Sequence, residues 1–348
     1  GKGLRGARDM SKQRKLSYLF SILWVAILFA AIMGAVATGV INSYYSGILV
    51  LIGINIILAV SLNLVTGFLG QLVLGHAGFM SVGAYSAALF TMHAGLPISV
   101  AFPLGLIFGG LVAAIFGVII GVPALRLRGD YLAIITLGFG EIIRVLVLAV
   151  DFTGGAAGLT GIPYIEGKYT LIIYTFFIAF LTVVAILAFI RSRHGRAVIA
   201  IREDEIAAEA SGINTTYYKL LAFVVAAFFA GVAGGIYAHY IGVLDPSKFD
   251  FNYSVEILIM VVLGGMGSIT GSVCSATVLT LLPEMLRSFA DKRMLIYSLV
   301  LIIVMLFKPT GLLGTREFSV RKIVGKLFKE KKKDTGTPPA GGAPGKEA

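Results

Sequence analysis

The sequence predicts an all-α, polytopic membrane protein, and two observations lead to this fold class. Hydrophobic residues make up 57% of the 348 residues and charged residues only 14%, whereas a soluble domain carries roughly 25% charged residues. Apolar runs of about 20 residues, the length that crosses the hydrocarbon core of a bilayer, follow one another along most of the chain. The alternating segments of about ten residues that are typical of a membrane β-barrel do not occur. We therefore expect about ten helices, with eight to ten complete crossings.

The expected helices follow the apolar runs in order. The first run is too long for the apolar core of a signal peptide and has no convincing cleavage site, so we expect it to remain in the protein as a helix. The whole series lies near residues 17–41, 47–66, 70–91, 97–122, 131–151, 169–190, 217–242, 254–268, 270–288 and 294–308.

Basic residues gather around the two ends of the chain, which accounts for the net charge of +11 without nucleic-acid binding. With a cytoplasmic N-terminus, six Lys and Arg residues precede the first helix, two lie at 126 and 128, five lie within 191–219 and ten follow from Lys308 onward, which is 23 of the 29. Cytoplasmic loops of membrane proteins carry an excess of Lys and Arg. The sequence therefore predicts that both termini are cytoplasmic.

This orientation divides the chain into five regions. They are a basic cytoplasmic N-terminus (1–16), a first transmembrane half (17–190), a cytoplasmic loop with a short helix (191–216), a second transmembrane half (217–314) and a basic, partly disordered cytoplasmic tail (315–348).

Two stretches of apolar sequence are interrupted by glycines, one in each half. They are "TGFLGQLVLGHAGFMSVGAY" (66–85) and "VVLGGMGSITGSVCS" (261–275). Broken helices at corresponding places in two halves point to an internal repeat and to a translocation pathway. The pathway candidates in these stretches are Gln71, His76, Gly264, Gly265 and Gly267.

The alternative for these glycines is close helix packing. Small residues four apart let helix backbones approach each other in membranes. Such pairs occur at Gly105/Gly109, Gly117/Gly121, Gly231/Gly235 and Gly267/Gly271. For His76, a packed and hydrogen-bonded side chain is the favoured alternative to a ligand.

No motif for chemistry or for ATP binding occurs. "GGMGSITGS" has the glycines of a phosphate-binding loop but lacks its lysine. The single cysteine, Cys274, excludes an internal disulfide and a cysteine-based zinc site. Without a triad, a metal cluster or paired carboxylates, we expect no cofactor and no enzymatic activity in this chain.

Ionisable residues deep in the helices would indicate an ion-coupled carrier. We take Glu141 and Arg144 as the only candidates. They lie three residues apart and can neutralise each other on one helix face. A buried pair that fixes helix packing is favoured over a pair that contacts substrate or protons.

The stretch "IREDEIAAEASGIN" (201–214) is acidic and rich in alanine. It predicts a short helix that starts near Glu203 and stops at Gly212, with Ile206, Ala210 and Ile213 on one apolar stripe. Helices that lie on a membrane surface carry Lys and Arg to meet anionic lipid, so these acids favour a protein partner. A solvated connector is the alternative.

Five blocks of the sequence resemble the inner-membrane permease subunits of ABC importers for branched-chain amino acids, the LivM type. The resemblance runs from about Ile48 to Gly314. The blocks are "SLNLVTGFLGQLVLGHAGFMSVGAY", "LRLRGDYLAIITLGFGEIIRV", "TGGAAGLTGIP", "GRAVIAIREDEIAAEASGINTTYYKLLAFVVAAFFAGVAGG" and "VVLGGMGSITG".

The resemblance implies an ABC-importer permease with internal repeats in a bacterial or archaeal inner or plasma membrane. It implies as partners a second, related permease, two cytoplasmic ABC ATPase subunits and a periplasmic amino-acid-binding protein, with membrane lipid around the chain. Glu205, Ala208, Glu209 and Gly212 are similar to the EAA-type coupling loop of such permeases, which docks on the ATPase. The alternative function is a secondary transporter of a small polar solute driven by H⁺ or Na⁺.

Overall fold

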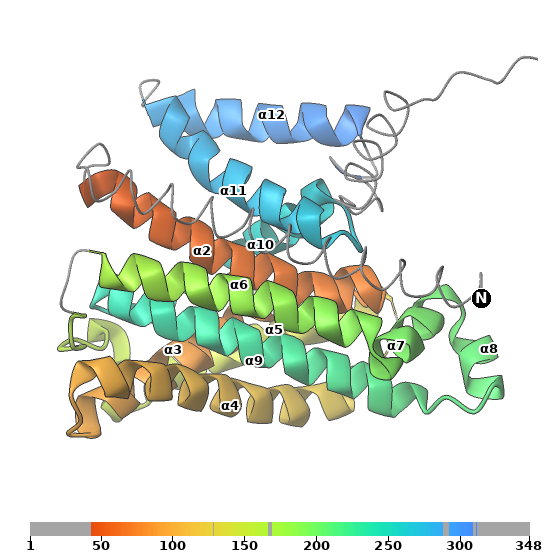
Figure 1. The fold of residues 1–348 in the computed structure, drawn as a ribbon, viewed down its shortest axis with the longest axis horizontal. Coiled ribbons are helices and arrows are strands. Elements are labelled where there is room, and N and C mark those ends of the chain that lie inside the picture. Colours follow the sequence, from red (N-terminus) through yellow and green to blue (C-terminus); the bar gives the residue numbers. More distant parts are fainter. Residues whose placement is uncertain (1–42, 128, 166–168, 288–291, 309–310, 312–348) are drawn as a thin grey trace, which may run out of the picture. The chain divides into compact units, whose positions relative to one another are not determined.

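Figure 1 shows the computed structural model of the chain. The structure describes residues 43–127, 129–165, 169–287, 292–308 and 311, all within one unit that spans Thr38–Glu317. The first expected helix, the basic N-terminus and the tail that follows residue 314 lie outside the described residues.

The described residues form helices joined by loops, without a strand, and the all-α prediction is confirmed. Short turns of 3-10 helix occur at η2 (Asp151–Thr153), η3 (Gly155–Ala157) and η4 (Pro246–Lys248). The longer elements are α2 (Ser43–Asn63), which continues into the π-helix η1 (Leu64–Phe68), α3 (His76–His93), α4 (Ile98–Ala124), α5 (Asp130–Ala149), α6 (Thr170–Arg191), α7 (Arg193–Glu203), α8 (Glu205–Ala210), α9 (Thr215–Ile241), α10 (Phe251–Gly264), α11 (Ile269–Met285) and α12 (Arg293–Phe307).

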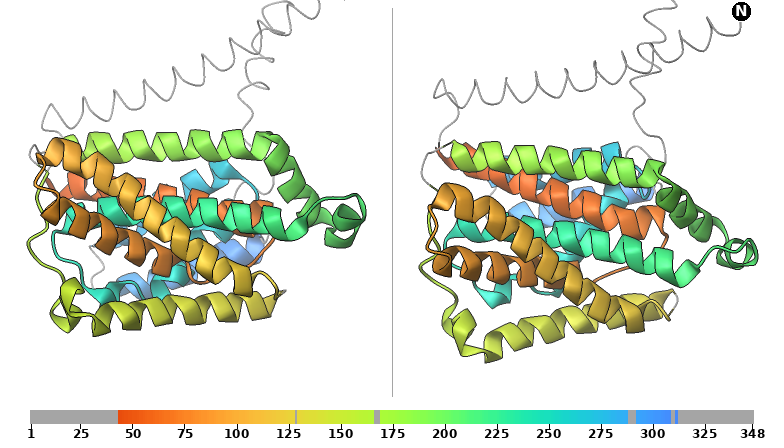
Figure 2. Two further views of the ribbon diagram at one scale, coloured as in Figure 1. Left: turned by 90° about the horizontal axis from the view of Figure 1, so that it is seen from below. Right: turned by 60° about the horizontal axis from the view of Figure 1, so that its bottom comes forward.

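Five of the described helical spans are long and apolar enough to cross a membrane, which confirms a multi-pass fold. They are Tyr44–Phe68, Ile98–Ala124, Asp130–Ala149, Thr170–Arg191 and Thr215–Ile241. The long helices run side by side in both views of Figure 2. The count of eight to ten crossings stays a prediction.

α10 and α11 form a hairpin with a tight turn at 265–268. The 14 residues of α10 rise by roughly 21 Å, which is less than the ~30 Å core of a bilayer. The helix expected at 254–268 begins at Phe251 and ends at Gly264, where the chain turns back. A complete crossing by this helix stays a prediction.

Glycines let α3, α4 and α9 pack with their backbones in contact. A Cβ at Gly109 would lie 2.6 Å from the carbonyl oxygen of Gly83, and one at Gly231 would lie 2.8 Å from that of Gly109. Gly235 packs against Ala87 and Leu106 in the same layer. The packing interpretation is confirmed for the glycine pairs of α4 and α9.

The Gly267/Gly271 pair differs from the others. Gly267 lies in the turn before α11, with a φ of 85°, so this pair does not form a helix face. The small-residue spacing there comes from a turn followed by a helix start.

The loop expected before the acidic stretch is in fact helix α7, so that expectation is wrong. Ser192 caps its N-terminus by accepting a hydrogen bond from the Gly195 amide at 3.2 Å. Val198 and Ile201 are buried and attach α7 to the bundle. The basic residues on the other face of α7 make this segment look like a polar loop in the sequence and so mask its apolar stripe.

The acidic helix begins two residues later than expected. Asp204 is extended and accepts hydrogen bonds from the amides of Ile206 and Ala207 at 2.9 and 3.0 Å. It thereby separates α7 from α8 and caps α8. Gly212, with a φ of 84°, ends the helix as predicted. Figure 2 shows α7 and α8 projecting at one end of the long helices.

Candidate functional site

An ion pair attaches the short helix α8 to the bundle. Nζ of Lys219, in the second turn of α9, lies 2.8 Å from Oε2 of Glu205. The Lys219 side chain is 3% exposed and that of Glu205 20%. Ala208 is also buried, at 5% exposure. Two of the four residues expected to contact a partner therefore face their own chain.

The opposite face of α8 is open. Ile206 is 73% exposed, and Glu209, Ala210 and Gly212 are exposed as well. We call these four residues the α8 surface. The acids Glu203 and Asp204 extend it toward α7. Of the predicted apolar stripe, Ile206 and Ala210 thus point away from the chain's own core, whereas Ile213 is half-buried.

The side chain of Asn63, at the end of α2 just before the first glycine-broken stretch, is hydrogen-bonded to the second stretch. Its Nδ2 donates to the Ser268 carbonyl at 2.9 Å and to Oγ of Ser272 at 2.8 Å. Its Oδ1 accepts from the Gly267 amide at 2.9 Å. Asn63 is fully buried, and Gly67 packs against it and Gly267 without room for a side chain. Sequence reasoning missed this residue, although an amide inside an apolar run was a visible signal.

The glycines of the second broken stretch differ in their surroundings. Gly264 packs against the backbone of Gly271, and Gly265 against Gly311, so both are enclosed by their own chain. Gly267 is half-buried, and Nη1 of Arg202 on α7 would lie 2.9 Å from a Cβ at this position. The two broken stretches therefore meet at the α7 end of the helices.

The first broken stretch contains a π-helix and then chain without regular secondary structure up to residue 75, instead of the start of the helix expected at residue 70. Its candidate His76 begins α3, is 2% exposed and lies 2.9 Å, through Nε2, from Oγ of Ser61. Gln71 is half-buried. Thr66 in the π-helix has a buried hydroxyl with no hydrogen-bond partner among the described residues, and π-helical turns are frequent at functional sites.

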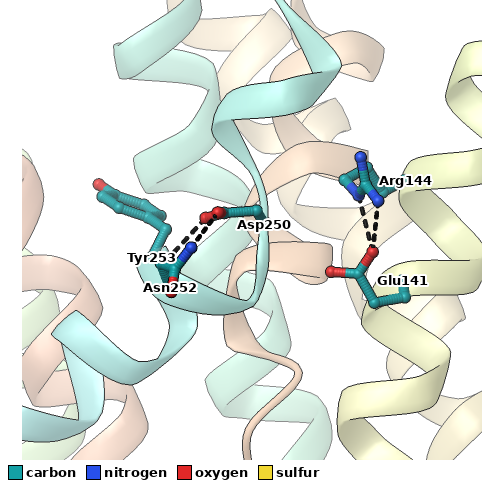
Figure 3. Close-up of polar contacts among 5 residues, drawn as sticks. All are labelled: Glu141, Arg144, Asp250, Asn252 and Tyr253. Atoms are coloured by element: carbon teal, nitrogen blue, oxygen red, sulfur yellow. Dashed lines mark hydrogen bonds and ion pairs between the residues drawn. The ribbon is translucent and has the colours of Figure 1, made fainter.

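Glu141 and Arg144 form the pair that their spacing predicts. Both Nε and Nη2 of Arg144 lie 2.7 Å from Oε2 of Glu141, and the two side chains are about one-third exposed. Figure 3 shows this pair on α5, a helix that contacts α10. In the same figure, Asp250 caps the N-terminus of α10: its carboxylate accepts hydrogen bonds from the Tyr253 amide at 3.0 Å and from Nδ2 of Asn252 at 2.7 Å.

The expectation that Glu141 and Arg144 are the only ionisable residues deep in the helices is wrong. Glu256 lies in the middle of α10 and is half-buried. A single charge is easily overlooked in a run as apolar as this one. The shortage of acids is thus a weaker argument against an ion-coupled carrier than the sequence indicated.

The loops at the other end of the long helices touch each other. Leu159 and Leu244 exchange backbone hydrogen bonds of 2.9 and 3.0 Å, and Oη of Tyr85 donates to the Leu244 carbonyl at 3.1 Å. Hydrogen bonds from the hydroxyl and amide of Ser247 lower the pKa of the neighbouring Asp245. These hydrogen bonds therefore stabilise the ionised form of the Asp245 carboxyl.

Within the described ranges, no group of three or more His, Cys, Asp and Glu side chains could hold a metal ion. The arrangement instead offers an open acidic helix at one end, a buried amide joint beneath it and a paired loop at the other end.

The model of one protein family, described as "Branched-chain amino acid transport system / permease component", matches residues 44–308. The permease protein LivM of the high-affinity branched-chain amino acid transport system of Salmonella typhimurium is 37% identical over 340 residues, covering 88% of this chain and 77% of that protein. LivM of Escherichia coli K12 is also 37% identical, over 333 residues, with coverages of 87% and 75%. LivH of the same strain is 35% identical over 143 residues, covering 40% of this chain and 46% of LivH. No solved structure matches.

Proposed function

This chain belongs to the family of permease components of branched-chain amino acid transport systems, and on that premise we propose that it is the transmembrane subunit of an ABC importer for branched-chain or other neutral amino acids. ATP hydrolysis belongs to separate subunits in this proposal. The orientation follows the basic residues: both termini, α7 and α8 lie in the cytoplasm, and the loops around Leu159 and Leu244 lie outside.

The observation that carries the proposal is the α8 surface. A helix of six residues is too short to be stable by itself, yet the Glu205–Lys219 pair and buried Ala208 keep it folded on the bundle. Its outward face combines a large apolar side chain, Ile206, with acids and small residues. Lipid would favour basic residues there, so the partner is a protein with a groove and a basic rim.

The partner on this surface is the cytoplasmic ATPase. Glu209, Gly212 and Ile206 make the contact, whereas Glu205 and Ala208 shape and hold the helix. Moving an alternating-access equilibrium from 1:99 to 99:1 takes about 5.5 kcal/mol of differential binding, which ATP-driven closure of two ATPase subunits supplies. A neutral amino acid alone has few contacts with which to supply it.

A second permease subunit completes the importer. In this chain α5 is largely exposed, with Ile134, Ile142, Val145 and Leu146 on its open face. The Glu141–Arg144 pair lies on the same helix and remains only part-buried. We take the pair as structural, holding α5 at the junction with the second permease, and its alternative role is substrate contact. The partial similarity to LivH fits two related permeases.

The pathway passes along the first glycine-broken stretch. Gln71, His76 and the unpartnered hydroxyl of Thr66 are its polar groups, and Gly267 lines it from the second stretch. Gly264 and Gly265, enclosed by backbone, shape the hairpin behind it. A periplasmic binding protein delivers the amino acid to the paired outer loops, where Asp245 is available to a basic partner.

Reconstitution in proteoliposomes tests the proposal. The chain is combined with the second permease, the two ATPases and the binding protein, and uptake of labelled leucine is followed with ATP inside. We expect accumulation that requires every component and ATP. The secondary-transporter alternative, kept because of Glu256, predicts accumulation by this chain alone under an H⁺ or Na⁺ gradient, and that result would overturn the proposal.

A further inference from the structure

Arg202, in the last turn of α7, contacts both glycine-broken stretches of the membrane domain. On one side its stem packs against Gly70: a Cβ at that position would lie 3.1 Å from Cγ and 3.6 Å from Cβ of Arg202. Gly70 has a φ of 78°. Glycine is therefore favoured here both by the backbone conformation and by the close approach of the Arg202 side chain.

On the other side, the head of Arg202 lies beside Gly267. A Cβ at Gly267 would be 2.9 Å from Nη1 of Arg202 and 3.5 Å from the carbonyl oxygen of Gly67. Gly267 is also the residue whose amide is held by Asn63. One side chain from outside the membrane spans therefore reaches the joint at which the two stretches meet.

The charge of Arg202 suits this place. The joined helix α2–η1 ends at Phe68, and α10 ends at Gly264, so both present their C-termini near this residue. A helix C-terminus carries a partial negative charge that a cation stabilises. The nearby N-terminus of α11 has the opposite sign, but Oγ of Ser268 accepts from the Gly271 amide and caps it.

The position of α7 allows this contact to transmit movement. α7 is followed directly by α8, with only Asp204 between them, so a movement of the α8 surface moves α7. Buried Val198 and Ile201 hold α7 to the bundle through apolar contacts. Such contacts let α7 slide more easily than the charged contact of Arg202 beside two helix ends does.

We propose that Arg202 is the positioning residue that transmits movement of the α7–α8 pair to the two glycine-broken stretches. The inference rests on the proposed function and adds the residue through which the ATPase acts on the pathway. Arg202 does not touch ATP or substrate. It determines how far the chain at Gly70 and Gly267 moves when α8 moves.

The test measures the ratio of leucine imported to ATP hydrolysed in the reconstituted complex. Arg202→Ala removes stem and charge, Arg202→Met keeps the stem, and Arg202→Lys keeps stem and charge without the planar fork. We expect the ratio to fall about tenfold for Ala, less for Met and least for Lys, while ATP hydrolysis continues. Arg196 and Arg202 are both exposed arginines of α7, so Arg196→Ala is the matched control for the loss of a surface charge and should keep the ratio.

The outcomes separate the inference from the function it rests on. If the unsubstituted complex imports no leucine, the proposed function fails. If it imports leucine and the Met and Ala variants keep the ratio, or lose transport and hydrolysis in equal proportion, the positioning role is wrong. An arginine that only anchors α7 at the lipid surface predicts that Lys equals Arg. If the Ala variant does not assemble, the Met and Lys variants decide the question.

Discussion

The ammonium of Lys219 and the carboxylate of Glu205 lie 2.8 Å apart and join α8 to the start of α9. Removing one partner leaves the other charge without compensation in a buried place, which costs about 3 kcal/mol or more. For Glu205→Ala the cheapest relief is detachment of α8, so we expect its amides to exchange hydrogen roughly 100-fold faster. Hydrogen exchange read by mass spectrometry checks this.

The matched control for that variant is Glu203→Ala, because Glu203 is an exposed acid in the last turn of α7, outside α8. The double variant Glu205→Leu, Lys219→Met should restore protection, since an apolar pair can replace a buried ion pair at little cost. Unchanged exchange in Glu205→Ala would show that Ala208 alone holds the helix.

Variants of the α8 surface should separate docking from folding. Ile206→Asp places a charge on a side chain that is 73% exposed, so the free energy of unfolding of this chain should change by no more than about 0.5 kcal/mol. A partner that buries this side chain would have to bury the charge as well, which is unfavourable. We expect at least tenfold weaker association with the ATPase, measured by co-purification at graded concentrations, and uptake reduced in parallel.

Asn63→Leu should destabilise the joint between the broken stretches. The substitution removes three hydrogen bonds. It leaves the Gly267 amide without its partner, at about 1–3 kcal/mol, whereas the Ser268 carbonyl keeps hydrogen bonds from the amide and the hydroxyl of Ser272. The apparent melting temperature of the detergent-solubilised complex measures the loss. Asn55→Leu on the same helix removes one hydrogen bond of 2.8 Å to Thr280 and a long one of 3.5 Å from the Tyr253 hydroxyl, and it should lower the melting temperature less.

The pair on α5 can be tested by exchanging its charges. Glu141→Arg with Arg144→Glu keeps a pair at the same spacing, so a structural pair predicts normal assembly and uptake within about twofold. Single substitutions leave one charge unpaired and should reduce assembly. If the exchanged pair assembles normally but uptake is lost, the two residues contact the substrate instead.

The sequence predicted the long helices well because each is a long, mostly apolar run. It failed at residues 66–75, since hydropathy does not distinguish a π-helix followed by irregular chain from an α-helix. It also failed at α7, whose buried stripe of Val198 and Ile201 is diluted by arginines.

The candidate site was only partly predictable for a related reason. The acidic composition identified α8, but which face of so short a helix is free depends on Lys219, fourteen residues after Glu205 and on another helix. Asn63 and Arg202 acquire their roles from glycines far away in sequence. No periodicity within a single segment contains that information.

The backbone contacts among Gly83, Gly109 and Gly231 limit which parts of the molecule can move. Interfaces made of side chains can change between two packings, because rotamers exchange as one helix slides over another. Where backbones touch there are no rotamers to exchange, and any sliding opens a void. We therefore expect α3, α4 and α9 to keep their mutual distances through a transport cycle. Pairs of spin labels on these three helices should report one constant distance, while pairs that span to α5 or α10 should report two.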